Sequence, residues 1–157
     1  MIFESKGEFL NELNKLNKFK VLGIDFGFKK SGLAIYNSEV NVVTPLIIFN
    51  NITSEFDKLI KLLSENRVNA VIVGYPLHLD GNETVQTDEI KKFAGMLVSK
   101  VNIPIILSDE RFTTSLANTL LKEAKLKRKV RNKMDDMVSA SILLENFFYW
   151  IYTKPKS

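Results

Sequence analysis

The sequence contains no cysteine and a single histidine, His78, among its 157 residues. The absence of cysteine excludes disulfides, thiolate zinc sites and a cysteine nucleophile. No apolar run reaches the roughly 18 residues that a membrane span requires. Residues 1–20 interleave glutamates with lysines, whereas a secretory signal would carry an apolar segment there. We therefore expect a cytoplasmic protein with no membrane segment.

The chain also lacks repeats, low-complexity tracts and Pro/Gly-rich linkers. Its length, with 45% hydrophobic and 25% charged residues, suits one folded domain. We expect this domain over residues 20–152. Residues 1–19 are expected to form an extension with an amphipathic helix over 5–17, which begins with a Ser5–Glu8 capping box.

Positive charge is concentrated in one segment. The net charge is +4, yet residues 122–133 alone carry +6, which leaves −2 for the rest of the chain. A mildly acidic body with one basic segment is typical of a protein that binds a polyanion. A solvated helix end would look the same, so both interpretations stay open.

The hydrophobic periodicity predicts a mixed α/β fold. Strands are expected at 20–26, 32–36, 42–49, 71–74 and 103–107, and helices at 54–66, 84–100, 114–124 and 136–151. The first three strands have short connections, which favour an antiparallel meander. The last two are continuously apolar and flank a helix, which indicates parallel strands. We therefore expect a five-stranded mixed sheet flanked by helices, with Ser54 and Asp57 as the capping box of helix 54–66.

Three carboxylates occupy comparable places in this fold. Asp25 ends the first strand, Glu110 follows the fifth, and Asp136 opens the last helix. Each has an ordinary interpretation, as a turn residue, a loop charge or a helix cap. Together, however, they can converge, because the expected sheet places the fourth and fifth strands beside the first. Carboxylates that converge suit Mg²⁺ or Mn²⁺, and two such ions about 3.5–4 Å apart can drive phosphodiester hydrolysis.

Four blocks, in order, carry a family resemblance: VLGIDFGFKKSGLAIYN, VIVGYPLHLDGNE, LSDERFTTSLA and KMDDMVSASILLENFF. They resemble the motifs of the YqgF-type (RuvX-like) family over roughly residues 20–151. This resemblance implies a ribonuclease H-like fold and a nuclease that matures pre-16S rRNA or resolves Holliday junctions. It places the acidic set on Asp25, Glu110 and Asp136, the last preferred to Asp135 because of its spacing to Glu145. The sequence departs from the family pattern at Lys30, Tyr75 and His78, which affects substrate contacts and leaves the acidic set intact.

Basic residues near these motifs are candidates for phosphate contacts. They are Lys29, Lys30, Arg111, Lys125, Lys127, Arg128, Lys129 and Arg131. Gly27 and Gly32 bracket the first two, and a glycine-rich turn there serves a tight hairpin. A similar turn occurs in actin-hexokinase kinases. Those proteins close two domains around a nucleotide, and this chain has one.

The sequence thus predicts a metal-dependent nuclease that processes the 5′ end of pre-16S rRNA. Its partner is nucleic acid, with RNA favoured over branched DNA. A dimeric Holliday-junction resolvase and a non-catalytic nucleic-acid-binding module are the alternatives. Monomer and homodimer both stay open.

Overall fold

The computed structural model describes residues 1–27, 29–75, 85–109 and 135–148. The elements are β1 (Ile2–Phe3), α1 (Lys6–Asn14), β2 (Lys20–Asp25), β3 (Lys30–Asn37), β4 (Val42–Asn50), α2 (Phe56–Glu65), β5 (Ala70–Tyr75), α3 (Val85–Lys100), β6 (Ile105–Asp109) and α5 (Asp135–Phe147). The helix predicted at 114–124 lies outside the described residues, as does His78. Among the helices described, none is both long enough and apolar enough to span a membrane.

The strands form one mixed sheet in the order β1-β6-β5-β2-β3-β4. Antiparallel pairing joins β2 to β3 and β3 to β4, and parallel pairing joins β5 to both β2 and β6. The predicted meander and parallel strands are therefore confirmed. The predicted count of five strands is one too low, because β1 pairs with β6 through only two residues. A strand of that length leaves no periodicity in the sequence.

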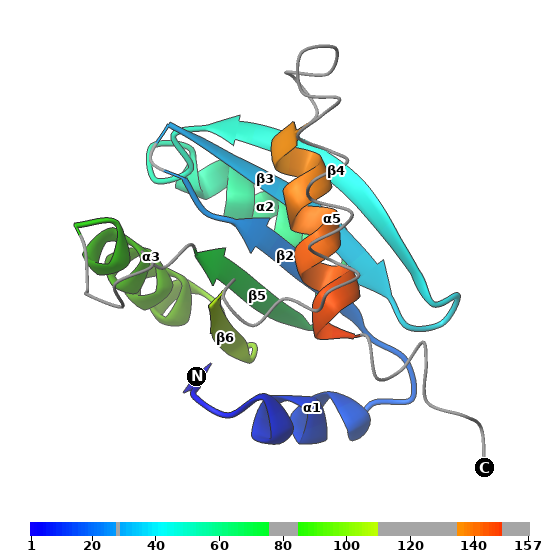
Figure 1. Ribbon diagram of the computed structural model, residues 1–157. Coiled ribbons are helices and arrows are strands. Elements are labelled where there is room, and N and C mark those ends of the chain that lie inside the picture. The colour runs from blue at the N-terminus through cyan, green and yellow to red at the C-terminus, as the bar shows by residue number, and fades with distance from the viewer. Residues whose placement is uncertain (28, 76–84, 110–134, 149–157) are drawn as a thin grey trace.

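Helices cover both faces of the sheet (Figure 1). On one face, α2 and α3 pack over the side chains of β2, β3 and β5 that belong to the larger core cluster. On the other face, α1 and α5 pack over the second cluster. Because alternate residues of a strand point to opposite faces, the same strands supply both cores. Leu22 and Ile24 of β2 belong to the first cluster and Val21 to the second.

The N-terminal segment packs onto the second core. Phe9 and Leu13 of α1 are buried there, and the ring of Phe9 meets that of Phe147 edge-on at 5.6 Å between centroids. The Ser5 side chain accepts a hydrogen bond from the backbone N–H of Glu8 at 3.3 Å. Ser5 is therefore the N-cap of α1, as the sequence predicts.

The predicted start of α2 is wrong by two residues. The helix begins at Phe56, and its N-cap, Glu55, makes no side-chain capping bond. Ser54 cannot be the cap because it belongs to the preceding turn. Its backbone N–H donates to the side-chain oxygen of Asn51 at 3.2 Å, and Asn51 has a left-handed φ of 56°. Asn is well suited to that conformation and to this local bond, so the Asn51 turn sets where the helix begins.

Candidate active site at the end of β2

Asp25 is the last residue of β2 and lies in the middle of the sheet. It is paired with Gly74 of the parallel strand β5 and with Gly32 of the antiparallel strand β3. Since β2, β5 and β6 are mutually parallel, their carboxyl ends meet at one end of the sheet, where open α/β sheets place their ligands. Asp25 is partly buried at this end.

The position of Asp25 along β2 places it on the face that α5 covers. Val21 packs in the core beneath α1 and α5, and Gly23 contacts Leu144 of α5. Asp25 follows in the same alternation. The carboxylate is therefore positioned by a strand whose other residues on this face are fixed by helix packing.

Two glycines allow α5 to approach the sheet closely. A Cβ on Gly23 would lie 2.6 Å from Cγ of Leu144, and a Cβ on Gly74 would lie 2.7 Å from Cδ2 of Leu143. Both distances are shorter than any ordinary contact, so a side chain at either position would force the facing leucine to shift. Helix α5 is consequently docked against the strand that ends in Asp25 and against its neighbour β5.

The turn after Asp25 is held by Ser31. This side chain is fully buried. Its hydroxyl accepts from the backbone N–H of Gly27 at 3.1 Å and donates to the carbonyl oxygen of Gly27 at 3.3 Å. A Cβ on Gly27 would collide with the carbonyl oxygen of Lys30. Gly27 therefore serves the tight hairpin, and the buried Ser31 fixes its shape.

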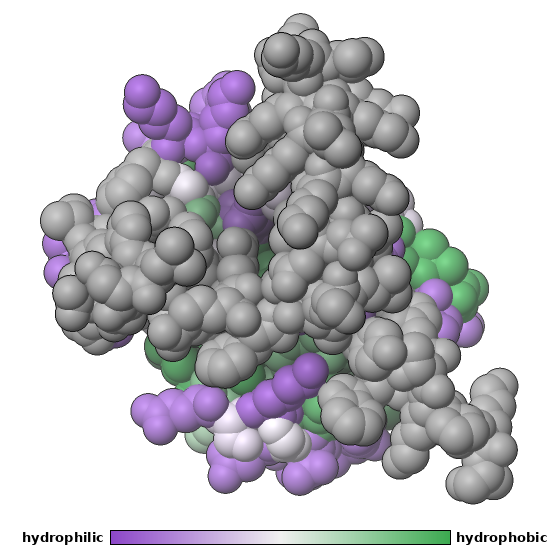
Figure 2. Space-filling model, in the orientation of Figure 1, coloured by the Kyte–Doolittle hydropathy of each residue, from purple (hydrophilic) through white to green (hydrophobic). Residues whose placement is uncertain are grey.

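Lys29 and Lys30 are exposed on this turn. The carbonyl oxygen of Lys29 accepts from the N–H of Asn51 at 2.9 Å, which ties the turn to the end of β4. Figure 2 shows hydrophilic residues gathered over this end of the molecule. Two ammonium groups on this turn, four and five residues after Asp25, have the chemistry to contact phosphates.

The other predicted site residues are only partly described. Asp136 lies in the first turn of α5 by its backbone. The remaining residues lie outside the described part of the chain, namely Glu110, Arg111, Lys125, Lys127, Arg128, Lys129 and Arg131. Within the described residues, no group of three or more His, Cys, Asp or Glu could hold a metal ion. Asp25, Lys29 and Lys30 thus lie on one hairpin, from the end of β2 to the start of β3.

Two contributors to this site are absent from the sequence-based set. Gly74 is the register partner of Asp25 and lets α5 approach, and Ser31 fixes the turn. The role of Gly74 depends on the pairing of β2 with β5, which the sequence does not show directly. The role of Ser31 depends on its hydrogen bonds to Gly27, and a serine near the start of an apolar strand has no distinctive spacing. A cluster of Lys18, Lys20 and Arg67 at the opposite end of β2 was missed as well. Arg67 lies 47 residues after Lys20 in the sequence.

Comparison with known proteins identifies relatives across nearly the whole chain. The family model described as "RuvX: Holliday junction resolvase" matches residues 19–149. The chain is 46% identical over 146 residues to a protein of Orientia tsutsugamushi named "Putative pre-16S rRNA nuclease", with 92% of each chain covered. It is 39% identical over 147 residues to a protein of the same name from Rickettsia africae, which covers 92% of this chain and 94% of the relative.

Solved structures share the fold at low sequence identity. RuvC of T. thermophilus, solved with a Holliday junction substrate, matches with a TM-score of 0.52 at 16% identity, over 86% of this chain and 97% of that one. The yeast mitochondrial Holliday junction resolvase matches with a TM-score of 0.53 at 16% identity, over 83% and 78%. These likenesses confirm the predicted ribonuclease H-like fold. Together with the match over residues 19–149, they lead to one conclusion: the chain belongs to the RuvX family.

Proposed function

We propose that this protein is a divalent-metal-dependent nuclease that hydrolyses phosphodiester bonds of nucleic acid, and that its substrate is the 5′ end of pre-16S rRNA. The relatives named as pre-16S rRNA nucleases, at up to 46% identity over 92% of the chain, support the activity and the substrate. The observation that carries the proposal is the place of Asp25. It ends the central strand, on the face where α5 is docked by two glycines.

The register of α5 supports Asp136 as a second member of the site. Ala140, Leu143 and Leu144 are buried against the sheet. Asp136 precedes Leu143 by seven residues, and at 3.6 residues per turn these positions differ by only about 20° around the helix axis. By the same reckoning Asp135 lies about 80° from Leu143 and about 140° from Ala140. The backbone of α5 thus favours Asp136 over Asp135.

Glu110 is proposed as the third member because it directly follows β6, which ends at Asp109. Strands β2, β5 and β6 are parallel neighbours, so a residue just beyond β6 starts from the same end of the sheet as Asp25. Three carboxylates are oxygen ligands that suit Mg²⁺ or Mn²⁺. One or two such ions would be held by Asp25, Glu110 and Asp136, and would supply charge neutralisation and Lewis-acid activation at the phosphate.

The other residues of the proposed site bind and orient the substrate. Lys29 and Lys30 project from the turn that Ser31 fixes, and Arg111 follows Glu110 in the sequence. An arginine can hold a phosphate through two parallel hydrogen bonds, whereas a lysine acts as a point charge. We assign to these three residues the alignment of the backbone phosphates on either side of the bond that is cut.

The test is cleavage by wild type and Asp25→Asn. Substrates are an end-labelled RNA spanning the 5′ end of 16S rRNA, a matched single-stranded DNA and a four-way DNA junction, each with Mg²⁺ and with Mn²⁺. We expect metal-dependent RNA cleavage, and a loss of about 100-fold or more in Asp25→Asn because a ligand carboxylate is removed. The matched control, Asp57→Asn, removes an exposed carboxylate from α2 and should cleave like the wild type.

Thermal unfolding separates the metal site from a turn residue. A ligand that binds only the folded state stabilises it by mass action, so Mg²⁺ or Mn²⁺ should raise the Tm of the wild type and raise that of Asp25→Asn less. Cleavage by Asp25→Asn at the wild-type rate would refute the assignment of this residue. A wild type that binds RNA without cleaving it would identify a non-catalytic binding module.

A second candidate function is resolution of Holliday junctions. The match to the family model described as "RuvX: Holliday junction resolvase" favours it. A junction presents two symmetric cleavage points, so this function calls for a dimer with closed two-fold symmetry. Cleavage confined to the four-way junction, by a protein that sediments as a dimer, would replace RNA with branched DNA as the substrate.

A further inference from the structure

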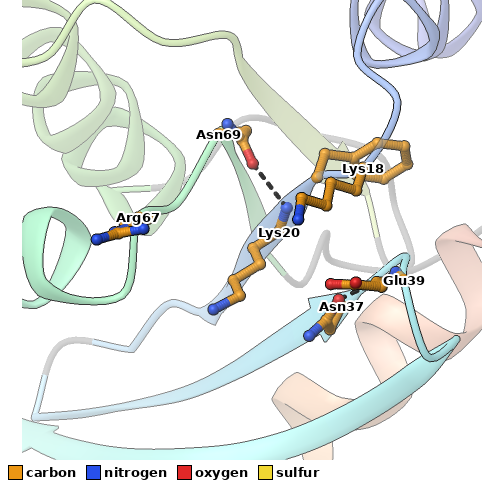
Figure 3. Close-up of a pocket in the computed structure, with 7 residues that line it drawn as sticks. Lys18, Lys20, Asn37, Glu39, Arg67 and Asn69 are labelled. Carbon is orange, nitrogen blue, oxygen red and sulfur yellow. Dashed lines mark hydrogen bonds between the residues drawn. The ribbon is translucent and has the colours of Figure 1, made fainter.

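A second polar hollow lies at the other end of β2. It has a volume of about 280 Å³. Three chain segments line it: the start of β2, the end of β3 with its following turn, and the loop between α2 and β5. The lining residues are Lys18, Phe19, Lys20, Asn37, Glu39, Arg67 and Asn69. Figure 3 shows Lys18 and Lys20 between Arg67 on one side and Asn37 and Glu39 on the other. We call this region the basic hollow.

Hydrogen bonds fix the three segments to one another. Phe19 donates its N–H to the Ser38 hydroxyl at 2.7 Å, and Ser38 donates its N–H to the carbonyl oxygen of Phe19 at 3.0 Å. On the other side, Lys20 donates its N–H to the side-chain oxygen of Asn69 at 2.8 Å, and Asn69 returns its N–H to the carbonyl oxygen of Lys20, also at 2.8 Å. The base of the basic hollow is therefore preorganised.

Positive charge prevails in the basic hollow. Lys18, Lys20 and Arg67 face one carboxylate, Glu39. Within the described residues, none of the three cations forms an ion pair, although four lysines elsewhere lie within 4 Å of a helical glutamate. Lys18 and Arg67 are exposed and Lys20 is half-buried. Unpaired cations around a fixed hollow form a site for an anion.

Hydrogen bonds at the end of α2 fix the backbone of Arg67. Arg67 directly follows the cap of α2 with a left-handed φ of 53°. Its N–H donates to the carbonyl of Ser64, and the N–H of Val68 donates to that of Leu63. This is the Schellman arrangement, in which the left-handed position normally belongs to glycine. An arginine there is held in an unfavourable conformation, as residues that clamp ligands often are.

We propose that the basic hollow binds backbone phosphates of the nucleic-acid substrate away from the bond that is cut. This inference rests on the proposed function for the nature of the substrate. Lys20, which lines the hollow, and Asp25 are the first and last residues of β2 and lie about 17 Å apart at 3.3 Å per residue. A stacked strand advances about 3.4 Å per nucleotide, so this contact falls about five or more nucleotides from the cleavage point.

Binding is measured in the Asp25→Asn background, so that cleavage does not interfere. The fluorescence anisotropy of a labelled single-stranded RNA is followed from roughly 50 to 200 mM salt, the range where phosphate contacts change affinity most clearly. The variants are Arg67→Gly, Lys18→Gln with Lys20→Gln, and Glu39→Gln. The control is Lys58→Gln with Lys92→Gln, which removes two exposed positive charges from α2 and α3.

Each phosphate contact contributes about 0.7 to the salt slope on single strands. We expect the slope to fall by about 0.7 in Arg67→Gly and by about 1.4 in the double lysine variant. Glu39→Gln should bind RNA more tightly, and the control should match the parent. Arg67→Gly should also unfold at a higher urea concentration, because glycine fits the left-handed position. Weaker binding by a more stable protein excludes loss of folding as the cause.

Two experiments test whether the bound phosphate belongs to a nucleic acid: one varies the length of the RNA, and the other adds pyrophosphate as a competing anion. RNAs with fewer than about five nucleotides beyond the cleavage point should bind the hollow variants as tightly as the parent, since they fall short of the hollow. Pyrophosphate that binds the wild type and not the variants, with RNA binding unchanged, would overturn the nucleic-acid assignment. An equal loss of RNA affinity in the control variant, Lys58→Gln with Lys92→Gln, would overturn the assignment of the basic hollow as a binding site. Failure of the proposed nuclease function appears separately, as unchanged cleavage by Asp25→Asn.

Discussion

Helix α5 is fixed to β2 by the contact between Gly23 and Leu144, and a double-mutant cycle can measure that contact. A Cβ on Gly23 would lie 2.6 Å from Cγ and 2.9 Å from Cδ2 of Leu144. Leu144 is fully buried, so its side chain has no free space into which it can withdraw. Gly23→Ala should therefore destabilise the protein by about 1–3 kcal/mol, the usual cost of adding a methyl group to a packed core.

Leu144→Ala should cost about 2–5 kcal/mol, because it removes a fully buried side chain and leaves a cavity. In the double variant the alanine at position 23 occupies part of the space that Leu144 vacates. The destabilisation of the double variant should therefore be smaller than the sum of the two single effects by about 1–3 kcal/mol, the range found for residues in direct contact. The wild type should be the most stable, followed by Gly23→Ala. The double variant should be at least as stable as Leu144→Ala.

The assay is urea unfolding of the four proteins, followed by far-UV circular dichroism. Gly95→Ala is the matched control. Gly95 is exposed in α3, and a Cβ there meets nothing within 4 Å, so alanine should stabilise the helix by up to about 1 kcal/mol. Additive effects of Gly23→Ala and Leu144→Ala would refute the close docking of α5 on β2. If the proposed function holds, nuclease activity of folded Gly23→Ala should also fall, because a displaced α5 would shift the proposed ligand Asp136 relative to Asp25.

Two further predictions concern charged groups. Glu145 is exposed, yet partial desolvation raises the pKa of its carboxyl, so its ionisation slightly lowers stability as pH rises above the unfolded pKa of about 4.3. At pH 7, Glu145→Gln should therefore unfold at a higher urea concentration than the wild type, and this difference should vanish below about pH 4. An equal difference at both pH values would contradict the prediction. Replacing Lys127, Arg128, Lys129 and Arg131 with glutamine should flatten the salt slope of RNA binding by about 0.7 per lost contact, whereas an unchanged slope would show a merely solvated surface.

The order of the strands could be predicted because each connection leaves a local signal. Short turns join the first three strands, and the helix 84–100 separates two apolar runs that are too short to be anything but buried strands. Pairing partners followed from the handedness and length of these connections. β1 left no such signal. Its place depends on a contact with β6 about a hundred residues away in sequence.

The candidate site was predictable to the extent that its chemistry is local. A carboxylate beside a glycine turn marks Asp25, whereas the closeness of Gly74 depends on register between β2 and β5. The basic segment 122–133 stands out because its charges are contiguous. The basic hollow does not, because Lys20 and Arg67 lie in different segments of the sequence. Folding brings them together through the hydrogen bonds of Asn69, and a count of charges along the sequence does not show this proximity.

The pairing of β1 with β6 also bears on solubility. A strand at the border of a sheet exposes unpaired N–H and C=O groups that can recruit another chain and start aggregation. Here Ile2 and Phe3 cover part of β6, and Ile105 donates its N–H to the carbonyl oxygen of Met1 at 2.9 Å. Detaching so short a strand costs far less free energy than global unfolding. At this edge of the sheet, resistance to self-association therefore depends on a local opening of the first residues, and not on global unfolding.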